Sequence, residues 1–353
     1  MSERSEHEGG PRSPARRAAG HAAGWALAVL AVAAVAFIYR KDIPAAGHAI
    51  ATARPAWLLA LLVLALLGLA TFGLLFRAGQ TAAGARVGLW EGIELGNAAY
   101  ALNLVVKSSG LAGVVVFTRR ARARAEPHGR AVAGYLLATV LSHFAFAAVL
   151  LAALAALLLG GRFTAVDAAA SAVFAVYLGF HVVVVVAAAR SRALVRAVYA
   201  GPRRALDRVR RILRLPSRAA TGPSEHADEL FDAIALIRTR PRRSLPVAGW
   251  AISVDLVHVL WVYAAVQAVG GGVGLEAALV AYGVATLFGI VGIVPGGLGF
   301  VELGMTAALV SYGMPTAAAA AATVLYRVAE LWLPLAAGAL ASRRLRRTAL
   351  VGS

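Results

Sequence analysis

The sequence predicts an all-α fold, a polytopic transmembrane helix bundle that holds two broken or re-entrant helix elements in a possible internal repeat. Of its 353 residues 60% are hydrophobic, whereas soluble globular chains have about 45–50% apolar residues. The apolar residues form long runs such as 57–76, 136–159 and 173–189. About 20 consecutive apolar residues suffice to span a bilayer as a helix. Two glycine-containing interruptions, at 107–113 and 294–299, predict the broken elements.

The net charge of +18 comes almost entirely from arginine, because Lys41 and Lys107 are the two lysines of the chain. The arginines lie between the apolar runs, as in the cytoplasmic loops of membrane proteins, where they also meet anionic lipid headgroups. We therefore expect membrane lipids and no nucleic acid as partners. The absence of cysteine excludes disulfides, thiolate metal sites and thiol nucleophiles, and no motif predicts a metal, a cofactor or a catalytic residue.

Composition divides the chain into five segments. The first apolar run, 22–39, is interpreted as an uncleaved span and not as a signal peptide, because it is long enough to cross and other spans follow. The segments are a disordered cytoplasmic tail (1–21), an N-terminal transmembrane half (22–189), an arginine-rich cytoplasmic segment (190–244), a C-terminal transmembrane half (245–341) and a basic cytoplasmic tail (342–353). The expected apolar segments are 22–39, 55–76, 88–106, 110–118, 131–159, 165–189, 246–269, 276–294, 299–312 and 315–341.

Charge parity predicts a hairpin in the first half. Segment 190–244 carries 14 arginines against five acids, so it should be cytoplasmic, as should both termini and the loop that contains Arg77 and Arg86. Between that loop and segment 190–244 the chain must cross an even number of times. The spans 131–159 and 165–189 supply two crossings, so the weaker pieces 88–106 and 110–118 must enter and return. Protein or a cavity must shield such a hairpin, because lipid cannot satisfy its backbone.

The two interruptions align at an offset of 187, which places Gly110 on Gly297. Interrupted apolar segments at corresponding places in two halves indicate a transporter-type site. Chance and ordinary loop glycines are the alternative. Between the halves, 203–215 has apolar residues at helical spacing among arginines, which indicates either an amphipathic helix on the cytoplasmic leaflet or a solvated basic linker. Segment 190–244 could also dock a membrane-protein partner.

A polar stripe at steps of three or four residues marks the segment before the first break. We expect Asn103 and Lys107 to line a headgroup cavity, with Lys107 as a phosphate partner beside Gly110. We expect Glu91 and Glu94 to be solvated at the cytoplasmic entrance. The stripe consists of Glu91, Glu94, Asn97, Tyr100, Asn103 and Lys107.

The second break is the sharpest local feature. Glycines permit a tight turn, and the restarted helix offers free N–H groups and a positive dipole end to a lipid phosphate. Glu302 follows on the first helical turn, either as a cap or opposite a cation. Arg327 lies inside a span and needs a partner, either Glu330 or Glu302. The break residues are Pro295, Gly296, Gly297 and Gly299.

Four further ionisable groups lie in the spans. Asp255 and His258, three residues apart, have either a structural helix–helix bond or a proton or headgroup role. His143 and His181 stand alone on apolar segments, which indicates packing or interhelical hydrogen bonds.

The C-terminal part resembles the lysylphosphatidylglycerol synthase transmembrane-region family, also called flippase-like. That family has a Pro-Gly-Gly-x-Gly-x-x-Glu break, followed by an alanine-rich helix with Tyr-Arg and Trp-x-Pro. The family's first break usually reads Asn-x-x-x-Pro-x-x-x-Gly-Glu; this chain has Asn103, Lys107 and Gly110 and differs by lacking the proline and the glutamate. The matching residues here are Pro295, Gly296, Gly297, Gly299, Glu302, Tyr326, Arg327, Trp332 and Pro334.

The resemblance implies a bacterial cytoplasmic-membrane bundle with broken helices. Some members also carry a soluble aminoacyl-transfer domain, for which we expect no counterpart here. The favoured function is therefore binding or translocation of an anionic phospholipid or lipid-linked intermediate. The alternatives are a membrane enzyme or an obligate subunit in lipid or envelope-glycan synthesis, and a structural scaffold. Without an ATP-binding motif, transport would run downhill, by ion coupling or with a partner.

Overall fold

The computed structural model describes most of the membrane-embedded part of the chain. The predicted tail 1–21, the first span 22–39, the break residues Lys107 and Gly110, and the segment 203–215 lie outside the described residues. The described ranges are 43–105, 112–161, 165–191, 239–291 and 295–351, with isolated residues 163, 193, 231 and 235.

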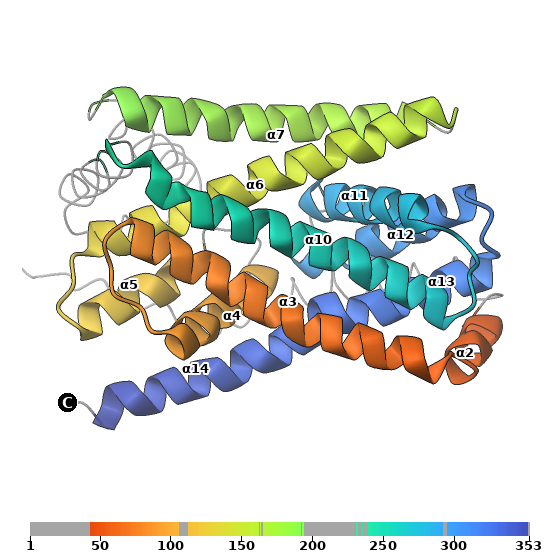
Figure 1. Cartoon of the computed structure of the whole chain (residues 1–353), viewed down its shortest axis with the longest axis horizontal. Helices are drawn as coiled ribbons and strands as arrows, with labels where there is room; N and C mark the ends of the chain where they lie inside the picture. The colour runs from red at the N-terminus through yellow and green to blue at the C-terminus, as the bar shows by residue number, and fades with distance from the viewer. Residues whose placement is uncertain are drawn as a thin grey trace, which may run out of the picture.

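All regular structure in these ranges is helical, which confirms the predicted fold class (Figure 1). Every expected apolar segment inside the ranges is a helix, and α2 is an additional short one. The elements are α2 (Ile43–Ala51), α3 (Pro55–Ala82), α4 (Leu89–Val105), α5 (Val114–Ala123), α6 (His128–Leu159), α7 (Ala165–Arg190), η1 (Pro241–Ser244), α10 (Leu245–Ala268), α11 (Leu275–Val291), η2 (Pro295–Gly297), α12 (Phe300–Ser311), α13 (Thr316–Arg327), the π-turn η3 (Val328–Trp332) and α14 (Leu333–Val351).

Four helical stretches are long and apolar enough to cross a membrane: Pro55–Ala82, His128–Leu159, Pro241–Ala268 and Thr316–Arg344. Their outward faces are apolar as well. Leu59, Leu62 and Leu66 on α3 are exposed at steps of three and four residues, and α10 exposes Ile252, Leu256 and Leu260 at steps of four. Such one-sided apolar stripes on long helices suit contact with lipid.

Proline and glycine set the helix ends. Pro55 occupies the first turn of α3 and Pro246 that of α10, where a missing N–H costs nothing. After α3 the chain turns through Gly84, which has a φ of 88°. The backbone N–H of Arg54, just before α3, donates to the carbonyl of Ala268 at the end of α10, 2.8 Å away. The two long helices are thus joined at one end of the bundle.

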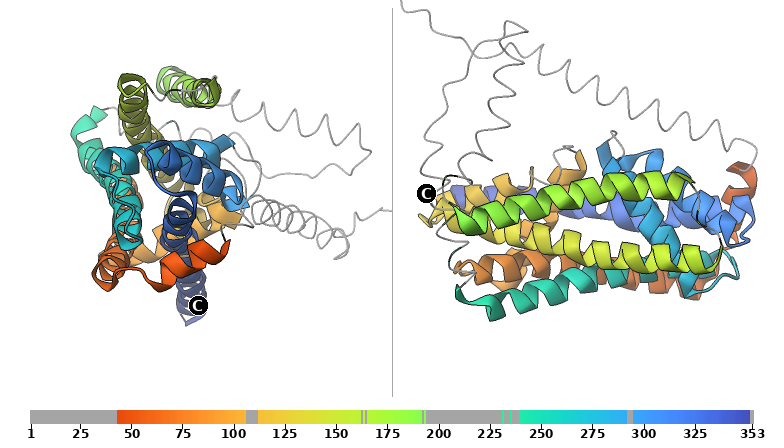
Figure 2. Two further views of the ribbon diagram at one scale, coloured as in Figure 1. Left: turned by 90° about the vertical axis from the view of Figure 1, so that its right-hand side faces the viewer. Right: turned by 90° about the horizontal axis from the view of Figure 1, so that it is seen from above.

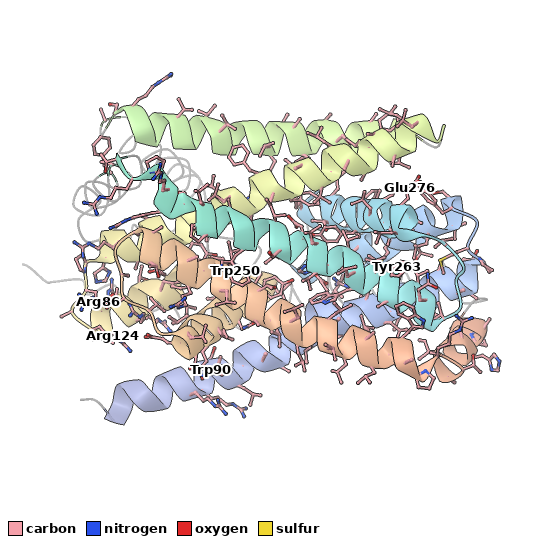
Figure 3. All side chains as sticks on the ribbon, viewed as in Figure 1. Arg86, Trp90, Arg124, Trp250, Tyr263 and Glu276 are labelled. Carbon is pink, nitrogen blue, oxygen red and sulfur yellow. The ribbon has the colours of Figure 1, made fainter. Side chains whose placement is uncertain are left out.

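Many arginines of the described residues lie in the helix ends and loops at one end of the molecule, the end on the left in Figure 1. Helices α3, α5, α7 and α14 end there, and α4, α6 and α10 begin there. Figure 3 shows Arg86 and Arg124 at this arginine-rich end and Glu276 near the opposite end. In the end-on view of Figure 2, α7 lies at the edge of the bundle beside α6.

Two short hairpins enter the bundle from opposite ends. Helices α4 and α5 enter from the arginine-rich end, whereas α11 and α12 enter from the other end (Figure 1). At about 1.5 Å per residue α5 is roughly 15 Å long, about half of the 30 Å hydrocarbon layer. The predicted return of the chain in the first half is therefore confirmed.

The two halves of the chain repeat the same four elements with inverted direction. Adding 187 to the bounds of α3, α4, α5 and α6 gives 242–269, 276–292, 301–310 and 315–346. Helices α10, α11, α12 and the α13–α14 unit occupy 245–268, 275–291, 300–311 and 316–351. The offset suggested by one pair of glycines thus holds for the whole order of elements, and the hairpins point toward each other from opposite ends (Figure 1).

Glycines allow the helices of the bundle to approach closely. A Cβ at Gly96 of α4 would lie 2.7 Å from the Cα of Gly73 on α3, and a Cβ at Gly338 of α14 would lie 2.7 Å from the carbonyl oxygen of Asn97. Both distances are shorter than any real Cβ contact, so α4 can pack between α3 and α14 only because these positions are glycine. Small residues at helix crossings are typical of membrane bundles.

Candidate ligand site where the two broken helices meet

The inner end of one hairpin touches that of the other near the middle of the bundle. Helix α4 contacts the turn η2, and the carbonyl oxygen of Leu104 lies 4.0 Å from where a Cβ at Gly296 would be. The end of α4, just before the first predicted interruption, therefore lies beside the second interruption.

Three glycines with left-handed backbone form the second break. Gly296, Gly297 and Gly299 have φ of 64°, 64° and 85°, a region that L side chains rarely adopt. A Cβ at Gly297 would also lie 2.7 Å from Cγ2 of Val301. Glycine is thus required here both for the turn and for the close return of α12.

The guanidinium of Arg327 is the centre of the site. Its side chain is only 4% exposed. Its Nε donates to Glu302 at 2.7 Å, one terminal nitrogen donates to Glu330 at 2.5 Å, and the other donates to the carbonyl of Gly296 at 2.7 Å. Both partners that the sequence offered as alternatives are therefore used at once. Glu302 also accepts the N–H of Gly299 at 2.7 Å, so it caps α12 and pairs with Arg327.

Pro334 leaves a backbone carbonyl free for a hydrogen bond between the two halves. Pro334 has no amide hydrogen, so the carbonyl of Glu330, four residues earlier, loses its usual helical donor. The Tyr100 hydroxyl on α4 donates to this carbonyl at 3.3 Å and lies 3.4 Å from the Glu330 carboxylate. The helix forms a π-turn over 328–332 at this point, and such turns occur frequently at functional sites.

We call Tyr100, Gly296, Glu302, Arg327 and Glu330 the Arg327 cluster. Two carboxylates share one guanidinium, so the cluster has one excess negative charge when both are ionised. The remaining guanidinium N–H groups have no acceptor among the described residues. The cluster can therefore offer donors to a phosphate and carboxylate oxygens to a cation. Tyr326 lies next to Arg327, is buried, and contacts the Trp261 ring.

A pocket of about 670 Å³ opens between α4, α5 and α14 at the arginine-rich end. Its polar lining is Glu91, Arg119, Arg120, Arg124 and Ser342. Its walls are apolar, with Leu95, Leu102, Val115, Val116 and Leu335 among them. A long apolar wall beside several arginines suits an amphiphile with an anionic headgroup.

Arg120 closes the outer end of the first hairpin. Its side chain is 6% exposed and donates to Glu91 at 2.9 Å, to Glu126 at 2.5 Å and to the carbonyl of Arg86 at 2.6 Å. Arg124 pairs with the same Glu91 at 2.9 Å. Glu91 lies at the outer end of the hairpin, but the expectation that it is solvated is wrong, because its side chain is 19% exposed and pairs with two arginines.

Most side chains of the polar stripe on α4 form hydrogen bonds or ion pairs outside the Arg327 cluster. Asn97 donates to the carbonyls of Leu69 and Ile93. Asn103 donates to the Tyr135 hydroxyl and accepts the N–H of Gly113, both at 2.8 Å, so it caps the beginning of α5. Glu94 lies 3.6 Å from the exposed Arg344. A headgroup role for Asn103 stays a prediction, as does the role of Lys107 and Gly110.

A second buried polar group lies between α10 and α11. The Tyr282 hydroxyl donates to Oδ1 of Asp255 at 2.5 Å, so Asp255 has an interhelical bond. The His258 ring lies beside Trp261 and Tyr282, with centroid distances of 4.3 and 5.6 Å. No sequence pattern pointed to Tyr282, because a single tyrosine in an apolar run has no predicted partner until the neighbouring helix is known. His143 forms an interhelical bond to Tyr177 at 2.8 Å, as predicted.

These features define a class of protein: a multi-pass α-helical membrane protein with paired re-entrant hairpins and a buried charged cluster where they meet. The family model described as lysylphosphatidylglycerol synthase TM region matches residues 23–338. The chain belongs to this family. None of the curated proteins with which the chain was compared matches it.

Proposed function

We propose that the protein binds the headgroup of a phospholipid or lipid-linked intermediate and moves it across the bacterial cytoplasmic membrane. The observation that carries this proposal is the Arg327 cluster at the meeting point of two inverted hairpins. Secondary transporters commonly bind their substrate near the membrane midplane, where discontinuous helices of inverted repeats leave polar backbone groups free.

The pocket beside Arg119 and Arg124 supports the proposal as an entry route. Under the positive-inside rule the arginine-rich end is cytoplasmic, and so is the end of α14, which lies there (Figure 1). An anionic headgroup would meet the arginines first, while its chains lie along Leu102 and Leu335 or in the surrounding lipid. Helix α4 lines this pocket and carries Tyr100 of the Arg327 cluster, so one helix joins entry route and midplane site.

Transbilayer movement of a fluorescent phosphatidylglycerol in proteoliposomes tests the proposal. We expect Arg327→Ala and Glu302→Lys to abolish the movement. Arg119→Ala with Arg124→Ala should slow it, because both side chains line the pocket and are exposed. Arg343→Ala, an exposed position outside the pocket, is the matched control and should behave as wild type.

Two further measurements make the outcome decisive. Each variant is checked for folding by size-exclusion profile and thermal stability. Folded Arg327 and Glu302 variants that move lipid at the wild-type rate would show that the site is assigned wrongly. A wild-type protein that moves no phospholipid but changes the amount of an envelope lipid product in cells would favour the enzymatic alternative.

A further inference from the structure

Asp255 is a buried acid for which the described residues supply no cation. It lies near the middle of α10 and is 5% exposed. Its Oδ1 accepts the Tyr282 hydroxyl at 2.5 Å. Its Oδ2 is also buried and has no hydrogen-bond partner among the described residues. An ionised carboxylate would present several acceptor sites here to a single donor.

The groups around Asp255 leave its charge uncompensated. On its own helix, His258 is 8% exposed, and its Nδ1 lies 2.7 Å from the Val254 carbonyl. From α13, Tyr326 interacts electrostatically with Asp255 and with Glu330. Arg327 of α13 is held by Glu302, Glu330 and Gly296.

The other elements packed against α10 also lack a cation near this position in the described structure. Arg77 is the one titratable group of α3 and donates to the Val87 carbonyl. The arginines of η1 are twelve or more residues from Asp255, about 18 Å along the helix. The remaining titratable groups on these elements are Glu276 of α11, which the Tyr312 hydroxyl contacts, and His128, Arg130, Tyr135 and His143 of α6.

We propose that Asp255 is a proton-binding site, protonated while the α10–α11 interface is closed. Burying an ionised carboxylate that has no cation is far more costly than burying a neutral acid with one unsatisfied O–H. The unpartnered Oδ2 is the atom that carries the proton. A metal cation fits less well, because hard cations take several oxygen ligands, whereas Asp255 and Tyr282 supply two, and no group of three His, Cys, Asp or Glu is found among the described residues.

Release of this proton is linked to movement of the second hairpin. An ionised Asp255 would need water, and separation of α10 from α11, whose Tyr282 holds its Oδ1, would admit it. Helix α11 is the first arm of the hairpin that carries Gly296 and Glu302 of the Arg327 cluster. Proton release would therefore shift half of the midplane site. This coupling rests on the proposed function, whereas proton binding by itself does not.

Infrared spectroscopy of the full-length protein in nanodiscs tests proton binding. We expect the wild type at neutral pH to have the carbonyl stretch of a protonated carboxylic acid, and Asp255→Asn to lose that band. Glu276→Gln, which removes an acid at the outer end of α11, is the matched control and should keep it. If the wild type lacks the band, or if Asp255→Asn retains it, the proton site is wrong. Because Asn is neutral and nearly isosteric, Asp255→Asn should fold, which its thermal stability checks.

Proteoliposomes that contain fluorescent phosphatidylglycerol test the coupling. Wild-type movement should respond to an imposed pH gradient, and Asp255→Asn should lose this response. A wild-type response to a sodium gradient in place of a pH gradient would overturn the proton assignment, as would an unchanged pH response in Asp255→Asn. A wild type that moves no lipid while its infrared band behaves as expected would refute the proposed transport and leave the proton site established.

Discussion

Replacing Arg327 by Ala should destabilise the protein strongly, because the change leaves two carboxylates without their cation. The Arg327 side chain is 4% exposed, and the side chains of Glu302 and Glu330 are 19% and 16% exposed. Removing one partner of a buried ion pair costs about 3–5 kcal/mol. The partial exposure of the two acids places the expected loss near the lower end, about 3 kcal/mol.

A combined variant separates charge from packing. In Arg327→Ala with Glu302→Gln and Glu330→Gln, no net charge stays buried at the site. This triple variant should therefore be more stable than Arg327→Ala alone, although it removes more groups. Arg327→Lys keeps the charge but not the planar fork, so its stability should lie between those of Arg327→Ala and the wild type.

The measurement is the free energy of unfolding in mixed micelles titrated with sodium dodecyl sulfate, followed by tryptophan fluorescence. Arg343→Ala, on the exposed part of α14, serves as the surface control and should change the free energy by less than about 0.5 kcal/mol. A loss under about 1 kcal/mol for Arg327→Ala, below the range for a broken buried pair, would refute the reasoning. So would a triple variant no more stable than the single one.

Three further predictions concern the contacts that build the site. Tyr100→Phe leaves the Glu330 carbonyl without its donor and should lower the free energy of unfolding by about 1 kcal/mol. In a Pro334→Ala background, where the helical N–H returns, the same change should cost clearly less. Equal losses in the two backgrounds of this double-mutant cycle would contradict the role of Pro334. Gly68→Ala places a methyl group against the ring of Trp261 and should destabilise the protein by about 1–3 kcal/mol. Gly249→Ala on α10, where a Cβ meets nothing within 4 Å, should be neutral or stabilising. Thermal unfolding of both variants tests this difference. Because the chain has no cysteine, single cysteines at the exposed positions Arg122 and Gly274 can be labelled with a membrane-impermeant maleimide. We expect Arg122→Cys to react from the cytoplasmic side and Gly274→Cys from the other side. Labelling of both from one side would refute the inverted arrangement.

The sequence determined the class of fold and the positions of its breaks. Apolar runs, arginine-rich loops and charge parity predicted the spans and a returning hairpin, since a bilayer imposes length and charge rules that act locally along the chain. The offset of 187 followed from one pair of glycines and turned out to register α3–α6 with α10–α14. Arg327 is expected to need a partner, because a charge in a span must be compensated.

Which partners meet was decided by tertiary structure. The sequence left Glu302 and Glu330 as alternatives for Arg327, and the fold uses both, because the turn at Gly296 brings α12 back against the end of α13, where Arg327 lies. Nor could spacing place Tyr282 on Asp255, or Tyr100 on the carbonyl that Pro334 leaves free. These contacts join helices far apart in sequence, and they depend on how closely glycines allow the helices to approach, which is a property of packed pairs and not of any one segment.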